Sequence, residues 1–145
     1  MALTILMFYT RRPDLTVAEF KKHMENKYLP IVKEVMGLHV PESTTLRYVE
    51  RCSSGFGDRL GATLASKYRN NPDAPVLLVG YPKDLGWDAM VEMSFKDDLH
   101  LMQGYAATNS AEGQRLRDAE EDFTVPDAMK VVLMDRITVT DRSMG

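Results

Sequence analysis

The chain has 145 residues, an apolar content of 44%, a charged content of 27% and a formal net charge of −3. These values predict one soluble globular domain, residues 1–145, long enough to bury a core without metals or disulfides. The acidic balance argues against a nucleic-acid groove. The single cysteine, Cys52, cannot form an internal disulfide and favours a reducing compartment, so we expect a cytoplasmic protein.

The first predicted element is a strand over residues 3–10. The run has no basic region before it and no small-residue cleavage site after it, which argues against a signal peptide. No stretch of the chain approaches the ~20 apolar residues of a membrane span, so we expect no membrane association. Alternation gives the strand two apolar faces, with Leu6 and Phe8 on one and Leu3, Ile5, Met7 and Tyr9 on the other. A strand that is apolar on both faces is normally covered on both sides.

A helix is predicted to follow, beginning after Thr16. Glu19 stands three residues beyond this threonine, which is the spacing of a capping box. Apolar residues then recur at three- and four-residue steps, and Gly37 is a plausible end of the helix. Pro30 interrupts this pattern, so we expect a kink or break over residues 26–29.

The rest of the chain alternates between strands and helices. Residues 53–75 interrupt this alternation and predict an insertion or lid, weakly helical over 58–68 and partly mobile. Residues 82–86 and 126–127 are predicted turns. We expect strands at 44–51, 76–81, 87–95 and 130–139 and helices at 96–106 and 110–123.

This order of elements predicts an α+β protein of the ferredoxin-like, split βαβ type, with helices on one face of an antiparallel sheet. The other face would stay open, and it would carry Leu6, Phe8, Val132 and Met134. An exposed apolar sheet is a liability in a monomer. We therefore expect a two-fold homodimer whose sheets pack together as a dimeric α+β barrel.

Four segments in this order resemble the EthD domain, a branch of the dimeric α+β barrel superfamily. They are Phe8 to Thr16, Glu19 to His23 with Leu29-Pro30, Trp87 to Phe95, and Asp118 to Phe123. The resemblance covers most of the chain except 53–75, and the middle of the chain looks most like filamentous-fungal members. Several such members are regarded as decarboxylases, dehydratases or cyclases of polyketide pathways. The founder of the family is an accessory protein of ether degradation, and many members have a histidine where this chain has Tyr28.

Four residues are candidate catalytic groups. On a helical wheel Tyr28 falls within the apolar arc and His23 at its edge, so both could face a cavity. His39 lies in a loop leading into a strand, and Tyr48 lies in a strand. Each also has a plain structural interpretation, as a core tyrosine or a solvent-facing histidine. His100 ranks last, as a solvated helix residue. The candidates for substrate binding are Tyr9, Trp87, Met93 and Phe95, which could instead be simple core residues.

No metal or cofactor is expected. The three histidines include no pair at helical spacing, and no carboxylate triad accompanies them. The chain has no phosphate-binding loop, nucleophile elbow or dinucleotide fingerprint.

These patterns favour a cofactor-free lyase or cyclase acting by decarboxylation, dehydration or aldol-type cyclisation on an aromatic or polyketide-like intermediate of secondary metabolism. The first alternative is a non-catalytic accessory or hydrophobic-ligand-binding protein. The second is a cofactor-independent oxygenase acting on an anthrone-like substrate. A histidine paired with a tyrosine or carboxylate inside a closed cavity would favour the enzyme, and histidines that all face solvent would favour the accessory role.

Overall fold

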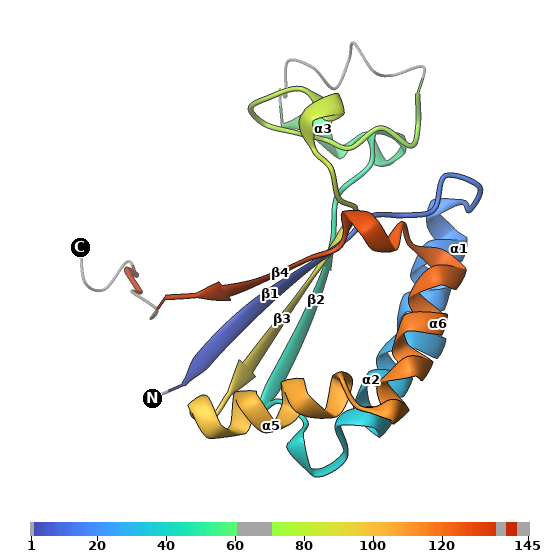
Figure 1. Ribbon diagram of the computed structural model, residues 1–145. Coiled ribbons are helices and arrows are strands. Elements are labelled where there is room, and N and C mark those ends of the chain that lie inside the picture. The colour runs from blue at the N-terminus through green and yellow to red at the C-terminus, as the bar shows by residue number, and fades with distance from the viewer. Residues whose placement is uncertain (1, 61–70, 136–138, 142–145) are drawn as a thin grey trace.

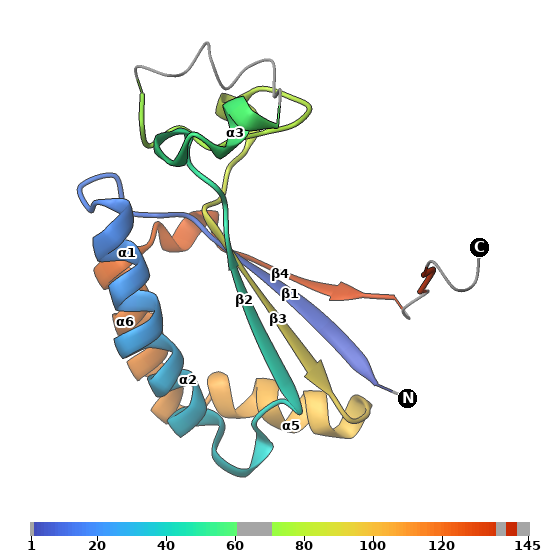
Figure 2. The ribbon, with the colours of Figure 1, turned by 180° about the vertical axis from the view of Figure 1, so that it is seen from behind.

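Four antiparallel strands form one sheet in the order β2-β3-β1-β4. A computed structural model describes residues 2–60, 71–135 and 139–141. The helices gather on one face of the sheet and leave the other uncovered (Figures 1 and 2). This is the predicted α+β, ferredoxin-like architecture. The strands are β1 (Leu3–Tyr9), β2 (Ser43–Tyr48), β3 (Ala89–Phe95) and β4 (Lys130–Met134).

The first helical segment begins as predicted. The Thr16 hydroxyl accepts a hydrogen bond from the Glu19 amide at 3.1 Å, and the Glu19 carboxylate accepts one from the Thr16 amide at 3.0 Å. This capping box starts α1 (Val17–His23). Gly37, with a φ of 56°, ends α2 (Leu29–Met36) because glycine tolerates positive φ without steric cost.

The break predicted near Pro30 takes the form of a π-helical turn, Met24–Tyr28, between α1 and α2. Pro30 has no amide hydrogen and its ring crowds the preceding turn, so a regular α-helical hydrogen bond cannot form there. The wider turn absorbs this defect. It also directs both Met24 and Tyr28 into the core, where they are buried.

Two further helices complete the layer: α5 (Asp98–Thr108) and α6 (Gln114–Phe123). α5 packs close to α2 because Gly104 has no side chain. A Cβ atom at Gly104 would lie 2.9 Å from the Met36 methyl and 3.1 Å from the Phe95 ring. α6 lies against α2 and the π-helical turn (Figure 1).

The core lies between the helices and the sheet. β3 alternates strictly, and the structure buries one of its faces, formed by Ala89, Val91, Met93 and Phe95, against the helices. The other fully buried large side chains are Tyr9, Phe20, Met24, Tyr28 and Phe123.

The opposite face of the sheet is open in the single chain. The register pairs Leu6 with Val132, and Phe8 and Met134 share their face, as predicted. Val132 is 41% exposed and Met134 is 40% exposed. The face also carries polar groups, because Leu6 pairs with Glu92 on β3.

The segment after β2 differs from the prediction. The strand predicted at 76–81 is wrong, because the chain is irregular there. Among the described residues, pairing is limited to a single bridge between Arg51 and Pro75 and a hydrogen bond from the Val76 amide to the Glu50 carbonyl. A strand needs a partner along its length, and residues 77–81 have none in the described part of the chain. A short helix, α3 (Phe56–Arg59), lies within the expected lid. Residues 61–68 of the helix predicted over 58–68 lie outside the described residues.

The last strand is also shorter than predicted. β4 ends at Met134, where its pairing with β1 stops at Thr4. Residues 136–138 lie outside the described part of the chain.

A buried ion pair joins the ends of this irregular segment to the sheet. Arg51 lies 2.6 Å from one carboxylate oxygen of Asp88, and the other oxygen accepts a 2.6 Å hydrogen bond from the Arg11 amide. Arg51 also donates to the Asp73 carbonyl at 3.1 Å. Asp88 therefore ties β1, the start of β3 and the segment beyond β2 into one unit.

Candidate functional site

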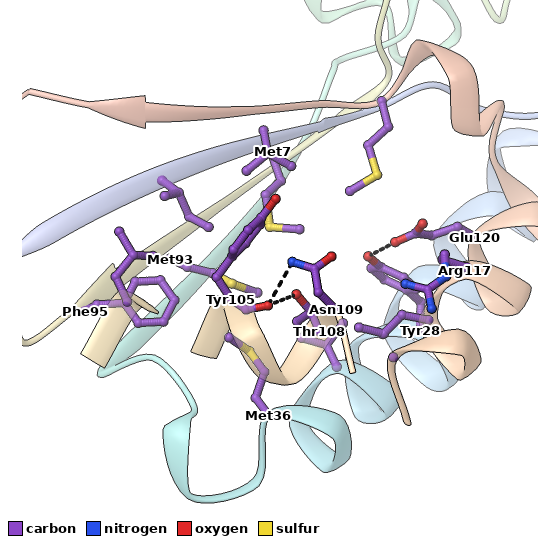
Figure 3. A pocket seen from close by; sticks show the side chains of 17 residues that line it. Met7, Tyr28, Met36, Met93, Phe95, Tyr105, Thr108, Asn109, Arg117 and Glu120 are labelled. Carbon is purple, nitrogen blue, oxygen red and sulfur yellow. Dashed lines mark hydrogen bonds between the residues drawn. The ribbon is translucent and has the colours of Figure 1, made fainter. Parts of the chain in front are cut away.

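A cavity of about 230 Å³ lies between the helices and the covered face of the sheet (Figure 3). Most of its wall is apolar and rich in methionine. This part includes Ile5, Met7, Val32, Met36, Met93, Phe95, Leu116, Met129 and Val131. Its polar members include Tyr28, Tyr105, Asn109, Arg117 and Glu120. A mainly apolar wall with a few grouped polar side chains is typical of a small-molecule site.

A chain of hydrogen bonds reaches the cavity from the core. The Tyr28 hydroxyl donates to Oε2 of Glu120 at 2.7 Å and lies 2.9 Å from the Tyr9 hydroxyl. A hydroxyl carries one hydrogen, so when Tyr28 donates to Glu120, Tyr9 must donate to Tyr28. The order is therefore Tyr9 to Tyr28 to Glu120, with the carboxylate at the cavity wall.

Burial shifts the acidity of all three groups. It raises the pKa of the Glu120 carboxyl, while the hydrogen bond from Tyr28 and the charge of Arg117 act in the opposite direction. Burial also raises the pKa of Tyr28 and of Tyr9. Both phenols therefore stay protonated and act as donors, and Glu120 is the member of the chain that can exchange a proton.

Local sequence explains why Glu120 faces inward. It lies four residues after Leu116 and three before Phe123, both of which are buried on α6. Residues at these spacings share one helical face. Glu120 was missed as a site residue because it belongs to the acidic run 120–122, whereas the helical wheel of α6 identifies it.

The polar end of the cavity is formed by α5 and α6. Figure 3 shows Arg117 and Glu120 beside Tyr28, across the cavity from Met93 and Phe95. On α5, Thr108 and Asn109 donate to the Tyr105 carbonyl at 2.7 and 3.2 Å. These two side chains bond to the backbone of their own helix end and are not linked to Tyr28 or Glu120. The acid–base chemistry of the cavity wall therefore rests on Tyr28 and Glu120.

Three of the predicted site residues line this cavity: Tyr28, Met93 and Phe95. Tyr9 does not line it but supports Tyr28 from behind, with the two rings edge-on at 5.4 Å. The structure therefore brings together one predicted catalytic residue and three predicted substrate-binding residues, although Tyr9 acts through Tyr28.

None of the three histidines lies in the cavity wall. His23 borders a separate hollow on the outer surface of α1 and stacks on Phe123 with ring centroids 5.9 Å apart. His39 is the last residue of a short 3₁₀ turn after α2 and is half-buried. His100 accepts from the Lys96 amide at 3.0 Å through Nδ1, so its Nε2 donates to the Val40 carbonyl at 2.9 Å. Backbone groups thus occupy both nitrogens of His100.

The remaining two candidates also lie elsewhere. The Tyr48 hydroxyl donates to Glu25 at 2.7 Å, and the Lys21 ammonium lies 5.0 Å from the Tyr48 ring. Trp87 packs against Phe8 with ring centroids 5.0 Å apart, away from the cavity. The structure therefore separates Tyr48 and Trp87 from Tyr28.

Residues 2–60, 71–135 and 139–141 contain no cluster of three or more histidine, cysteine, aspartate or glutamate side chains able to hold a metal ion. None of the helices in these same ranges combines the length and the apolar character needed to cross a bilayer.

The fold and the cavity define a ferredoxin-like α+β protein with an apolar internal pocket. The family model of the EthD domain matches residues 12–127, so the chain belongs to the EthD-domain family. No curated protein matches the sequence significantly.

Solved structures with the same fold are distant in sequence. An EthD family protein of Bacillus halodurans has a TM-score of 0.53 and 16% identity, with 94% of this chain and 100% of that chain covered. An uncharacterized NIPSNAP-like domain protein of Burkholderia xenovorans has a TM-score of 0.50 and 13% identity, with 97% and 89% covered. At these identities the likeness extends to the fold alone.

Proposed function

We propose that this protein is a cofactor-free lyase or cyclase that transfers a proton on an aromatic or polyketide-like molecule inside the cavity. Decarboxylation, dehydration and aldol-type cyclisation of such molecules all pass through an enol or enolate. The step that they share is proton transfer at a carbon next to a carbonyl. The observation that carries the proposal is the Glu120 carboxyl, held by Tyr28 at the wall of an apolar cavity.

Glu120 is the proposed base and acid. Its Oε2 accepts from Tyr28, while Oε1 has no hydrogen-bonding partner within the described residues and is available to a substrate. A carboxylate whose pKa is raised by burial is a better base near neutral pH than an exposed one. The apolar wall strengthens this effect by limiting water around the carboxylate.

The hydrogen-bond chain behind Glu120 ends inside the protein. Tyr9 has no measurable exposure, so the chain has no route to solvent through this residue. Tyr28 and Tyr9 therefore orient the carboxylate rather than conduct a proton away from it. A proton taken by Glu120 therefore leaves on the cavity side, where the carboxyl can return it to the substrate or exchange it with water.

A second candidate function is non-catalytic binding of a hydrophobic metabolite. It is favoured by the position of His23, His39 and His100, all outside the cavity wall. A binding protein would need the apolar pocket but not a carboxyl group with a raised pKa.

The assembly and location remain part of the proposal. The apolar side chains on the open sheet face support a homodimer with paired sheets, for which light scattering would give twice the chain mass of 16.4 kDa. A stable monomer at micromolar concentration would contradict the homodimer.

We also propose a cytoplasmic location, a single domain with 53–75 as its lid, and a role like that of the fungal polyketide-pathway proteins that the sequence resembles.

The test is deuterium exchange at the acidic CH₂ of 2-tetralone, a bicyclic ketone, followed by NMR in D₂O. The protein should accelerate exchange above the buffer rate, and 2-naphthol, which has the same bicyclic carbon frame, should inhibit by occupying the cavity. Binding of 2-naphthol without any acceleration of exchange would favour the binding protein instead.

A further inference from the structure

Arg117 differs from the other cation on its helix. It lines the cavity one turn before Glu120, and its Nε donates to Gln114 at 3.1 Å. Arg117 is exposed, and its two terminal nitrogens have no hydrogen bond or ion pair within the described residues. Arg115, two positions earlier, is instead paired with Glu34 at 2.6 Å.

We infer that Arg117 binds a carboxylate of the substrate at the polar end of the cavity, so that the substrate is an aromatic carboxylic acid. This inference rests on the proposed function and adds the class of substrate to it. A guanidinium with both terminal nitrogens free presents two parallel donors, which match the two oxygens of a carboxylate. The apolar wall formed by Met93, Phe95 and their neighbours receives the ring system.

The size of the cavity limits that ring system. At about 230 Å³ it lies below the range of about 300–1,000 Å³ that is usual for ligand pockets. A bicyclic aromatic acid is therefore a better match than a long polyketide chain. Figure 3 shows the Arg117 and Glu120 side chains together, so an acid held by Arg117 brings its ring carbons toward Glu120.

The contact between Arg117 and the substrate carboxylate also bears on which of the proposed reactions takes place. An ion pair with Arg117 stabilises the substrate carboxylate in the ground state, and loss of CO₂ would sacrifice that stabilisation in the transition state. The bound carboxylate is therefore an anchor that stays on the molecule. Proton transfer leading to dehydration or cyclisation is favoured over decarboxylation of that group.

The test compares two probes by fluorescence titration: 3-hydroxy-2-naphthoate and its neutral amide, 3-hydroxy-2-naphthamide. The wild-type protein should bind the acid more tightly than the amide. Arg117→Gln should weaken binding of the acid by about tenfold or more, because a charge-assisted hydrogen bond is lost, and should leave the amide unchanged. Arg117→Lys should recover part of the preference, since lysine restores the charge without the paired donors.

Arg115→Gln is the matched control, because it removes an arginine from the same helix outside the cavity wall. It should leave the affinity for both probes unchanged. Equal wild-type affinity for acid and amide, no binding of either probe, or an undiminished acid preference in Arg117→Gln would overturn the inference.

These outcomes are separable from the proposed function. Glu120→Gln removes the proposed base but not the anchor, so it should bind the acid at least as tightly as the wild type does. Acid preference without 2-tetralone exchange would leave the anchor standing and remove the catalytic proposal. Exchange of 2-tetralone without a preference for the acid would support the catalytic proposal and remove the role of Arg117 as an anchor.

Discussion

The Tyr28 hydroxyl donates a hydrogen bond of 2.7 Å to the Glu120 carboxylate, which lies 92 positions further along the chain. Tyr28 is the last residue of a π-helical turn, and Glu120 lies on the inward face of α6. The π-helical turn before Pro30 places Tyr28 at the cavity wall, and the helical spacing from Leu116 places Glu120 at the same wall. This pair is the only link between a buried phenol and a cavity-lining carboxyl among the described residues.

Tyr28→Phe should destabilise the protein by about 1–2 kcal/mol, because it leaves the buried Tyr9 hydroxyl without its tyrosine partner and removes a charge-assisted hydrogen bond from Glu120. It should also slow exchange of 2-tetralone. Urea denaturation measures the first effect and NMR the second.

Tyr48→Phe is the control for this change. It removes a hydrogen bond of the same 2.7 Å length, from the Tyr48 hydroxyl to the carboxylate of Glu25, and Glu25 is exposed to solvent. We expect a stability change below about 0.5 kcal/mol. Equal losses of stability in Tyr28→Phe and Tyr48→Phe would mean that the buried hydrogen bonds of Tyr28 contribute no more than the exposed one of Tyr48.

Glu120→Gln should change the pH dependence of stability. Since burial raises the pKa of Glu120, the folded state holds this proton more tightly than the unfolded state. The stability of the wild type must therefore fall, through this group, as pH rises from the ordinary value of 4.5 toward the folded pKa. Glutamine does not titrate, so this loss should be absent in the variant.

Urea denaturation at a series of pH values from 4 upward measures the effect. The stability of Glu120→Gln relative to the wild type should increase with pH, and the exposed Glu121→Gln should run parallel to the wild type. Parallel curves for both variants would contradict a raised pKa at Glu120.

Much of the fold followed from local chemistry. Thr16, Glu19 and Gly37 fix both ends of the first helical segment through caps that need no tertiary contact. The strict alternation from Ala89 to Phe95 predicted the strand β3, and the structure shows which of its two faces is buried. The strand expected at 76–81 failed because an apolar run predicts burial, while a strand also requires a paired neighbour.

The site was less predictable for a related reason. Tyr28 was found because the helical wheel placed it inward. Glu120 was missed because it stands in a run of acidic residues, although it shares a face with Leu116. The link between Tyr28 and Glu120 depends on how α6 packs against the π-helical turn, and a single sequence does not contain that contact. The catalytic role expected for His23 is an untested alternative to the one proposed for Glu120, because a position outside the cavity wall does not by itself test the chemistry of the imidazole.

His23→Ala should leave 2-tetralone exchange unchanged. The imidazole stacks on Phe123 at the outer side of α1, so its loss should cost about 1 kcal/mol of stability and no activity. The NMR exchange rate and urea midpoint measure both effects. Loss of exchange in a folded His23→Ala protein would return the proposed catalytic role to His23.

Asp88→Asn should loosen the segment between β2 and β3. The Arg51 and Asp88 side chains are only 10% and 16% exposed, and breaking a buried ion pair costs about 3–5 kcal/mol. Cys52 adjoins Arg51 and is the only thiol in the chain. Its rate of reaction with a disulfide reagent should therefore rise in the variant.

Glu34→Gln is the control for the ion pair, because it breaks the exposed contact with Arg115. A surface pair contributes about 0–1 kcal/mol, and the thiol rate should not change. An Asp88→Asn protein with the wild-type urea midpoint and thiol rate would show that the pair does not anchor this segment.

The most direct test of the account is the rate of 2-tetralone exchange in Glu120→Gln beside Glu121→Gln. The two variants remove neighbouring carboxyls on one helix, one in the cavity wall and one exposed. Glu120→Gln should lower the protein-catalysed rate by about 10²-fold or more, while Glu121→Gln should retain the wild-type rate. Equal rates in the two variants, with both proteins folded, would contradict a catalytic role for Glu120.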